Sequence, residues 1–329
     1  MASRHAAILA AEPKVAPAII CSSQRSLGKA EEFQARYGFQ QRTADFESVI
    51  ADDSIDIVYV CSPDPTHPTF TAQALRAGKH VFCEKPLARN PRGLEMVSTA
   101  RLENPKPILQ IGMNCRYREQ YSIPKQYLDS GELGPLRFIR GNYLLNKVAS
   151  VKRREKEWWL DHPPEIEFFL HANGVHILDL MRWLGGPVES VFARSSGFEL
   201  GEDFKSDTFS ISLGFQSGAL GEVLISSAAF HPRDVSLSIW CQNGSVVGTD
   251  LYRRRGEEVD AVPEKIEVVQ KTLDLGLQLR DLLTAIETGE QPMNSFQEAR
   301  ENFWLIQAIE RSIQEKRAVL LENRFENSR

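Results

Sequence analysis

Short apolar runs alternate with helical spacing through the first third of the chain. Leu27, Ala30, Phe33 and Tyr37 recur every three or four positions, which predicts a helix that ends at Gly38. The same reasoning predicts buried strands at 15–21, 55–61, 79–83 and 108–111, and helices at 2–11, 46–51, 66–78 and through 94–100. Strands that alternate with helices in this way indicate βαβ units and a parallel sheet.

Beyond Gly112 a two-residue period becomes common, so we place a domain boundary there. From 207 to 215 the apolar positions share one face, and they are Phe209, Ile211, Leu213 and Phe215. Asn243-Gly244 predicts a two-residue hairpin turn. Amphipathic helices are expected at Leu275–Thr288 and Phe296–Lys316. The second part is therefore predicted to be α+β, with an open, mostly antiparallel sheet.

Composition excludes several classes of function. The 329 residues carry 39 basic and 44 acidic side chains, a net charge of −5, whereas nucleic-acid binders are usually basic. No apolar run approaches the roughly 20 residues that cross a bilayer, and the run at 6–11 is too short for a signal peptide. The five cysteines form no C-x-x-C pair, which favours reduced thiols. We expect a cytoplasmic protein without nucleic-acid or membrane partners.

Residues directly after the predicted strands are candidates for ligand binding, because open parallel sheets bind ligands at the carboxyl ends of their strands. The strand that ends near Cys21 is followed by Ser22, Ser23 and Arg25. Two hydroxyls and a guanidinium suit a ribose 2′-phosphate better than a 2′-hydroxyl. The alternative is that Ser23 or Ser26 only caps the following helix.

Two further strand ends carry polar residues. The loop Ser62-Pro63-Asp64-Pro65-Thr66-His67 meets the start of a helix, where backbone donors can hold a phosphate or ribose and the Thr66 hydroxyl can cap the helix. The next strand ends in Cys83-Glu84-Lys85-Pro86. A lysine fixed there can polarise a hydroxyl or carbonyl oxygen, and the alternative is a solvated ion pair at a strand end.

Helical spacing over 166–184 brings three polar side chains to one face. At about 100° per residue, Asn173 and Asp179 lie within about 60° of His176, and His171 lies about 140° away. An imidazole is a natural general acid or base that a carboxylate can orient, and the alternative is a histidine with only a structural role. The spacing does not converge on three metal ligands, so we expect no metal.

Together these segments resemble the Gfo/Idh/MocA oxidoreductases, the family of glucose–fructose oxidoreductase and inositol dehydrogenase. AGKHVFCEKPL at 77–87 is similar to the family pattern A-G-K-H-V-x-x-E-K-P-L. The loop at 62–67 is similar to T-P-N-x-x-H, and the segment at 173–179 to one that contains G-x-H-x-x-D. The segment at 279–289 is also typical of the family.

The resemblance implies an α/β protein with a Rossmann domain at 1–112 that binds NAD or NADP. An α+β domain at 113–329 would bind a sugar-like substrate and form a dimer or tetramer. Hydride transfer is implied, with Lys85 polarising the reacting oxygen, His176 moving its proton and Asn173 beside it. Implied cofactor contacts come from Ser62, Pro63, His67, Glu84, Lys85, Asn114 and Arg116, while Ser22, Ser23 and Arg25 favour NADP.

The chain departs from the family pattern at two places. The family begins with a strand and a G-x-G-x-x-G turn, whereas the first glycine here is Gly28. We expect either a start further upstream or weak or absent nucleotide binding. The family aspartate four residues before the histidine is Ala172, so the usual proton-relay partner of His176 is missing.

The leading hypothesis is an NAD(P)-dependent oxidoreductase that acts on a sugar, cyclitol or related polyol. The alternative is a non-catalytic member of the family that senses a ligand or regulates another process. Both hypotheses are compatible with a homo-oligomer whose interface is the sheet face that carries Ser210 and Ser212.

Overall fold

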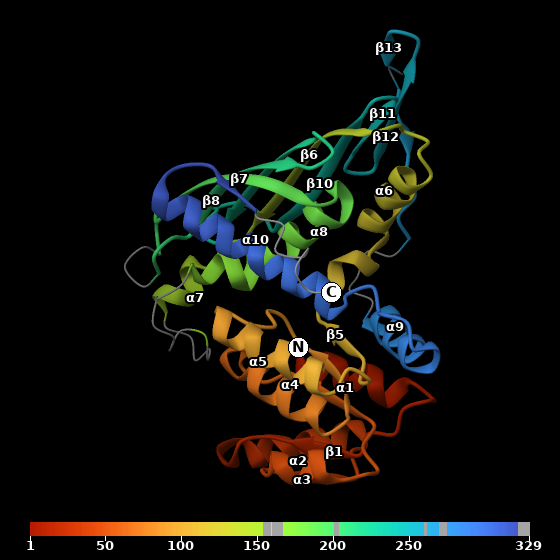
Figure 1. Ribbon diagram of the computed structural model, residues 1–329, viewed down its shortest axis with the longest axis vertical. Coiled ribbons are helices and arrows are strands. Elements are labelled where there is room, and N and C mark those ends of the chain that lie inside the picture. Colours follow the sequence, from red (N-terminus) through yellow and green to blue (C-terminus); the bar gives the residue numbers. More distant parts are fainter. Residues whose placement is uncertain (154–158, 160–166, 201–203, 260–261, 270–274, 322–329) are drawn as a thin grey trace. The chain divides into compact units, whose positions relative to one another are not determined.

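The chain forms two compact units, the first made of Met1–Asn114 with Asp274–Ala299 and the second of Cys115–Leu273 with Arg300–Arg329. The computed structural model describes residues 1–153, 159, 167–200, 204–259, 262–269 and 275–321 (Figure 1). The sequence placed α9 (Leu275–Thr288) in the second domain, but this helix packs in the first unit. Its Leu282 and Ala285 share a buried cluster with Phe82 and Ile108.

The first unit contains parallel strands in two separate sheets. The strands are β1 (Ile19–Cys21) paired with β2 (Gln41–Thr43), and β3 (Ile57–Val60), β4 (His80–Cys83) and β5 (Leu109–Ile111) in that spatial order. The helices are α1 (Ala2–Ala11), α2 (Leu27–Tyr37), α3 (Phe46–Ala51), α4 (His67–Arg76) and α5 (Pro91–Glu103). The predicted alternation of strand and helix is confirmed, although the strands are shorter than the apolar runs that predicted them.

Most helix ends follow the expected rules. Gly38 ends α2 with a φ of +74°, and the Asp45 side chain caps α3 by accepting from two backbone N–H groups. The expected hydroxyl cap by Thr66 is wrong. Residues Asp64–Thr66 form a 3₁₀ turn, and the Thr66 hydroxyl lies 2.7 Å from the Pro63 carbonyl oxygen instead.

The second unit is built on one large sheet. Its strands are β6 (Leu136–Leu144), β7 (Val188–Ser196), β8 (Thr208–Phe215), β9 (Leu220–Ser226), β10 (Asp234–Cys241), β11 (Gly244–Val247), β12 (Asp250–Arg255), β13 (Glu258–Val259), β14 (Glu264–Lys265) and β15 (Val319–Leu320). The spatial order is β13-β12-β11-β10-β6-β9-β8-β7-β15, with β14 paired to β12. Among these pairs only β6–β9 is parallel, so the predicted mostly antiparallel sheet is confirmed for the described strands.

The hairpin predicted around Asn243-Gly244 is confirmed, but these two residues do not form its turn. Trp240 and Ser245 are the last pair between β10 and β11, and Gly244 is already part of β11 through its pairing with Arg253 of β12. A Cβ atom on Gly244 would lie 2.4 Å from the backbone oxygen of Tyr252. This glycine therefore permits close approach of β12 and does not supply a turn conformation.

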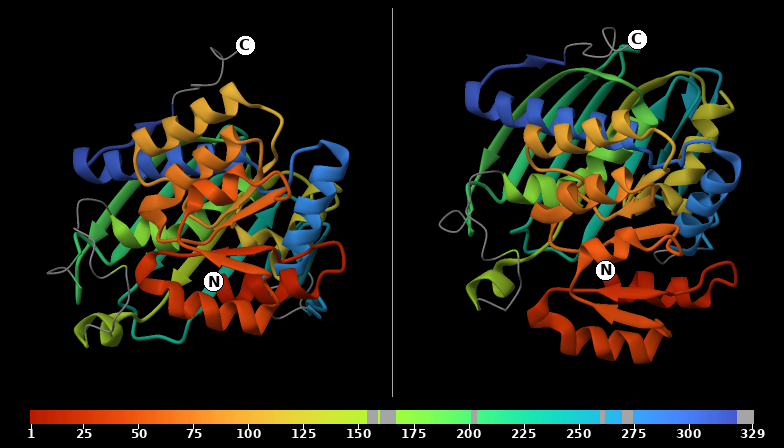
Figure 2. Two further views of the ribbon diagram at one scale, coloured as in Figure 1. Left: turned by 90° about the horizontal axis from the view of Figure 1, so that it is seen from below. Right: turned by 60° about the horizontal axis from the view of Figure 1, so that its bottom comes forward.

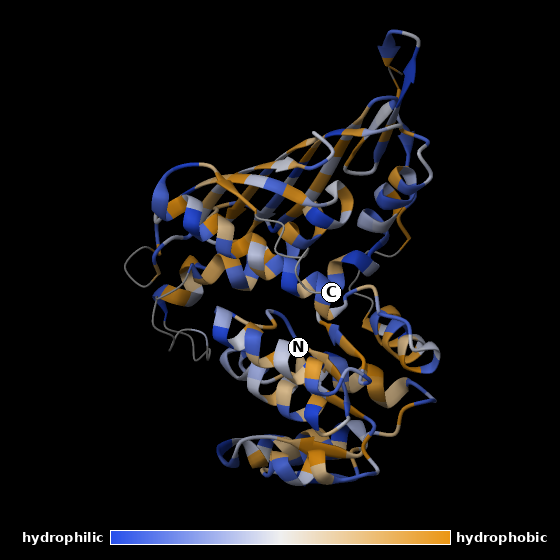
Figure 3. Ribbon diagram, viewed as in Figure 1, coloured by the Kyte–Doolittle hydropathy of each residue, from blue (hydrophilic) through white to orange (hydrophobic). Residues whose placement is uncertain are grey.

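Helices cover one face of the large sheet (Figure 2). They include α8 (Val175–Gly185) and α10 (Phe296–Glu315), with α6 (Glu119–Asp129) and α7 (Val148–Lys152) elsewhere in the unit. A Cβ atom on Gly141 of β6 would lie 2.7 Å from Ile177, so this glycine lets α8 lie close to the sheet. Both α9 and α10 alternate polar and apolar residues as predicted (Figure 3). None of the described helices combines the length and apolar character that crossing a bilayer requires.

Candidate functional site

Glu84, directly after β4, is a buried carboxylate held from two sides. Its Oε1 lies 2.7 Å from Nε2 of His5 on α1, and its Oε2 accepts from the backbone N–H of Lys85 at 3.2 Å. Burial alone raises the pKa of Glu84, but His5 and the Lys85 ammonium outweigh it and hold this pKa below its usual value. Glu84 is therefore an ionised anchor that fixes the backbone of Lys85.

Two neighbours complete the surroundings of Glu84. A Cβ atom on Gly112 would lie 3.0 Å from the Glu84 Oε2, so the glycine at the end of β5 makes room for the carboxylate. The His5 ring packs 4.7 Å from the Phe82 ring between centroids, which keeps the imidazole facing Glu84. Sequence reasoning missed His5, because nothing in the pattern of α1 distinguishes it from an ordinary helix residue.

His67 links the loop after β3 to the loop after β4. Its Nε2 lies 2.9 Å from the carbonyl oxygen of Ser62 and its Nδ1 lies 2.8 Å from that of Pro86. Both partners are acceptors only, so both ring nitrogens donate and the ring is an imidazolium. Burial lowers the pKa of His67, but Cys83 and the two carbonyl groups raise it to about 9. The residue cross-links the two loops that the sequence singled out.

At the end of β1, the predicted 2′-phosphate site is exposed. Ser23 and Arg25 are exposed, and the Ser23 hydroxyl donates to that of Ser26 at 3.2 Å. Neither Ser23 nor Ser26 caps its helix through the side chain, so the capping alternative is wrong. Two hydroxyls and a guanidinium follow β1, and burial together with the nearby Asp45 carboxylate raises the pKa of the Cys21 thiol at the end of this strand.

The carboxyl ends of β1, β3 and β4 together fit a dinucleotide cofactor. They present hydroxyls, backbone groups, Arg25 and Lys85 at the edge where open parallel sheets bind nucleotides. Asn114, also predicted to bind the cofactor, is 8% exposed at the start of the turn that follows β5. Cofactor contacts from these residues remain a prediction.

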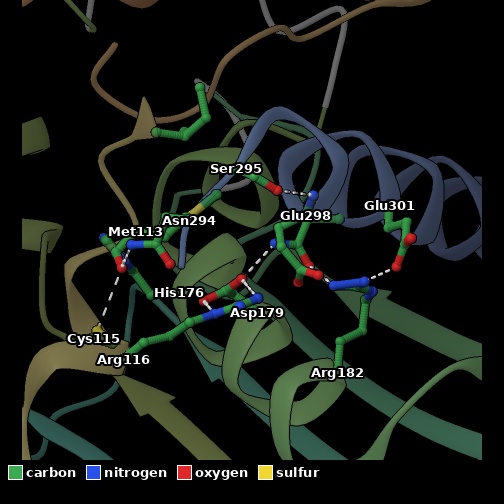
Figure 4. Close-up of polar contacts among 12 residues, drawn as sticks. Met113, Cys115, Arg116, His176, Asp179, Arg182, Asn294, Ser295, Glu298 and Glu301 are labelled. Atoms are coloured by element: carbon green, nitrogen blue, oxygen red, sulfur yellow. Dashed lines mark hydrogen bonds and ion pairs between the residues drawn. The ribbon is translucent and has the colours of Figure 1, made fainter. Parts of the chain in front are cut away.

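In the second unit, His176 on α8 is clamped on one edge and one face. The Cys115 sulfur lies 3.8 Å from its Nδ1 (Figure 4). The Tyr143 ring stacks on the imidazole with centroids 6.0 Å apart and planes at 10°. The contact at Nδ1 directs Nε2 to the opposite edge of the ring. Sequence reasoning found His176 but neither of these neighbours.

Asp179, expected to orient His176, is used differently. Its oxygens accept from Arg116 at 2.9 Å and 2.6 Å and from the Asn302 amide at 2.6 Å. Arg116 and Asp179 are 2% and 0% exposed. This buried, bidentate pair ties the turn that carries Cys115 to the helix that carries His176 (Figure 4). The cofactor contact expected of Arg116 remains a prediction.

The helical projection used for Asn173 does not apply. Leu170–Gly174 is a π-helical turn before α8, which changes the angular relation between Asn173 and His176. The Asn173 amide donates to the Ser227 hydroxyl at 3.0 Å, and His171 lies 3.1 Å from Glu310 in a buried structural contact. Within the described ranges, no three His, Cys, Asp or Glu side chains are grouped to hold a metal ion.

In the first unit, residues suited to nucleotide binding follow the parallel strands, and in the second unit a histidine is held by contacts at one ring nitrogen and one ring face. This combination is typical of two-domain, nucleotide-dependent oxidoreductases. Residues 1–111 match the oxidoreductase family with an NAD-binding Rossmann fold, and residues 124–247 match the GFO/IDH/MocA C-terminal domain. The chain belongs to the GFO/IDH/MocA family, and the resemblance predicted from the sequence is confirmed.

Several relatives are known. The chain is 25% identical over 310 residues to myo-inositol 2-dehydrogenase of Thermotoga maritima, covering 89% of this chain and 88% of the relative. It is 33% identical over 205 residues to inositol 2-dehydrogenase 2 of Saccharopolyspora erythraea, covering 60% and 56%. A levoglucosan dehydrogenase solved with NADH and L-sorbose has a TM-score of 0.83 at 23% identity, covering 97% and 95%. This last likeness shows the fold.

Proposed function

We propose that the chain is an NAD(P)-dependent dehydrogenase that oxidises a secondary alcohol of a sugar, cyclitol or related polyol. The names of its relatives support a cyclic polyol as substrate. The observation that carries the proposal is the fixed position of Lys85, whose backbone is held by the buried carboxylate of Glu84 at a strand end. A lysine so placed holds a substrate oxygen with little loss of freedom.

In the proposed reaction, the Lys85 ammonium donates a hydrogen bond to the reacting oxygen and stabilises its developing negative charge. His176 takes the hydroxyl proton at Nε2, because Nδ1 faces Cys115. Bound NAD(P)⁺ would supply the hydride acceptor, and the oxidised product would be a ketone. Asn173 is held by Ser227 near the start of α8, and we propose that it orients substrate hydroxyls.

A regulatory role is the second candidate, and Ala172 favours it because alanine cannot relay a proton from His176. Such a protein would bind cofactor and ligand without turnover. For either role we propose the cytoplasm, where NAD(P) is available and where the five free cysteines stay reduced.

We propose NADP as the preferred cofactor, supported by Ser22, Ser23 and Arg25. Titration followed by cofactor fluorescence is expected to show NADPH binding about tenfold more tightly than NADH, a difference of about 1.4 kcal/mol. Arg25→Ala should remove the preference, and Arg36→Ala on the same unit is the control. Equal affinities in the wild type would contradict the preference. If neither cofactor binds at millimolar concentration, the enzyme proposal fails.

We also propose a homodimer through the sheet face that carries Ser210 and Ser212. Both serines are exposed, and Leu224, paired with Ser210 in the ladder, is 41% exposed. Leu224→Arg is expected to convert the dimer into monomers in analytical ultracentrifugation, because it places a charge in an apolar contact. Leu102→Arg, at a residue 84% exposed on α5, is the control. A wild type that sediments as a monomer at micromolar concentration would refute the dimer.

A further inference from the structure

Two arginines of the second unit act on Tyr143, the residue whose ring stacks on His176. Arg118 immediately precedes α6, and Arg233 immediately precedes β10. The Tyr121 hydroxyl of α6 donates to the carbonyl of Val235 at 2.7 Å, and Val235 pairs with Tyr143 across the β10–β6 ladder. Since Tyr143 stacks on His176, this arrangement brings the start of α6, the start of β10 and the His176 ring together.

Both arginine charges act on the phenol groups of Tyr121 and Tyr143. Burial raises the pKa of each phenol, and the positive charges of Arg118 and Arg233 oppose that rise in both cases. Arg233 also forms a hydrogen bond with the Tyr143 hydroxyl. Two cations therefore act on the same pair of buried hydroxyl groups, one of which belongs to the ring that stacks on His176.

These arginines differ from the other arginines near α8. Arg116 is paired with Asp179, and Arg182 with Glu301. The Nε of Arg118 is buried without a hydrogen-bond partner, and in the described part of the chain neither Arg118 nor Arg233 forms an ion pair with an acidic side chain. The nearby Asp234 carboxylate accepts from the Ser236 hydroxyl. A buried donor without a partner is costly, so a ligand that supplies an anion would be favoured here.

We propose that Arg118, Arg233 and the Tyr143 hydroxyl form an oxyanion subsite beside His176, and that the substrate is a polyol with a carboxylate or a phosphate ester. Guanidinium groups present paired N–H donors that match the oxygen spacing of both anions. The inference rests on the proposed function, because it describes the substrate of the same His176 site. It narrows the class from neutral polyols to sugar acids and sugar phosphates.

The test compares three probes of one sugar with NADP⁺ as oxidant: glucose, glucuronate and glucose 6-phosphate. For the wild type, one of the two anionic sugars is expected to exceed glucose in kcat/KM by about 100-fold, and which one identifies the anion. Arg118→Met and Arg233→Met should each lower the anionic-to-neutral ratio of kcat/KM by about 10-fold or more. Arg137→Met, at an exposed arginine of β6, removes the same charge elsewhere and should leave the ratio unchanged.

A binding measurement separates the subsite from the proposed function. Glucuronate or glucose 6-phosphate should raise the melting temperature of the wild type more than glucose does, and the two variants should lose this difference while circular dichroism shows that they fold. Anion-dependent stabilisation without turnover would keep the subsite and overturn the dehydrogenase. Turnover of glucose with no advantage for either anionic sugar would overturn the subsite and keep the dehydrogenase.

Discussion

Replacing Lys85 with methionine is expected to lower kcat about a thousandfold while the dissociation constant for NADPH changes little. Methionine keeps the apolar stem but removes the ammonium that stabilises charge on the reacting oxygen. The Glu84 carboxylate keeps its bond to His5, so the strand end should stay folded in the variant. Steady-state kinetics and cofactor fluorescence measure the two quantities on the same preparation.

Lys106→Met, at an exposed lysine of the first unit, is the matched control and should retain wild-type kcat. If Lys85→Met turns over at the wild-type rate, Lys85 has no part in the reaction. If cofactor binding falls together with kcat, the ammonium holds the cofactor, and its proposed role at the substrate oxygen is wrong.

Replacing Asp179 with alanine is expected to cost about 3–5 kcal/mol of the free energy of unfolding. The change leaves the Arg116 guanidinium, 2% exposed, without its carboxylate, and it also removes the acceptor of Asn302. Denaturation in guanidinium chloride measures the loss. Because Arg116 follows Cys115 directly, the variant should also release the contact at Nδ1 of His176.

An exposed ion pair supplies the comparison. Arg140 and Glu222 pair on neighbouring strands with side chains 55% and 51% exposed, so Glu222→Ala should change stability by less than about 1 kcal/mol. The double variant Arg116→Met with Asp179→Leu should recover most of the stability lost by Asp179→Ala, since no unpaired charge remains buried. An Asp179→Ala loss as small as that of Glu222→Ala would show that the pair is unimportant.

The hydropathy pattern predicted elements well where one face alone is buried. The alternation in β8 fixes which side chains face inward, and Phe209, Ile211, Leu213 and Phe215 are all buried. The pattern failed to assign α9 to its unit, because an amphipathic helix shows that it has an apolar face but not which surface covers that face. The prediction of a turn at Gly244 failed for a related reason. This residue must be glycine because the backbone of β12 lies close to it, and its neighbour Asn243 has no part in that requirement.

The candidate site could be predicted at strand ends, because residues that directly follow the strands of a parallel sheet lie together at one edge of it. Glu84 and Lys85 were found in this way, and His176 was found from helical spacing. Their contacts His5 and Cys115 come from other segments and carry no local pattern. The projection of Asn173 assumed a regular helix, and a π-helical turn invalidated it. Sequence reasoning thus located reactive groups but could not find the side chains that hold them.

The two hydrogen bonds of His67 allow the amino-acid sequences of the two surrounding loops to vary. Its acceptors are backbone carbonyl oxygens of Ser62 and Pro86, which every amino acid supplies. This link depends on the His67 side chain alone, and the buried ion pair between Asp64 and Arg89 is a second link between the same two loops. Substitutions elsewhere in either loop can alter the ligand it receives while this imidazolium keeps the two segments in register.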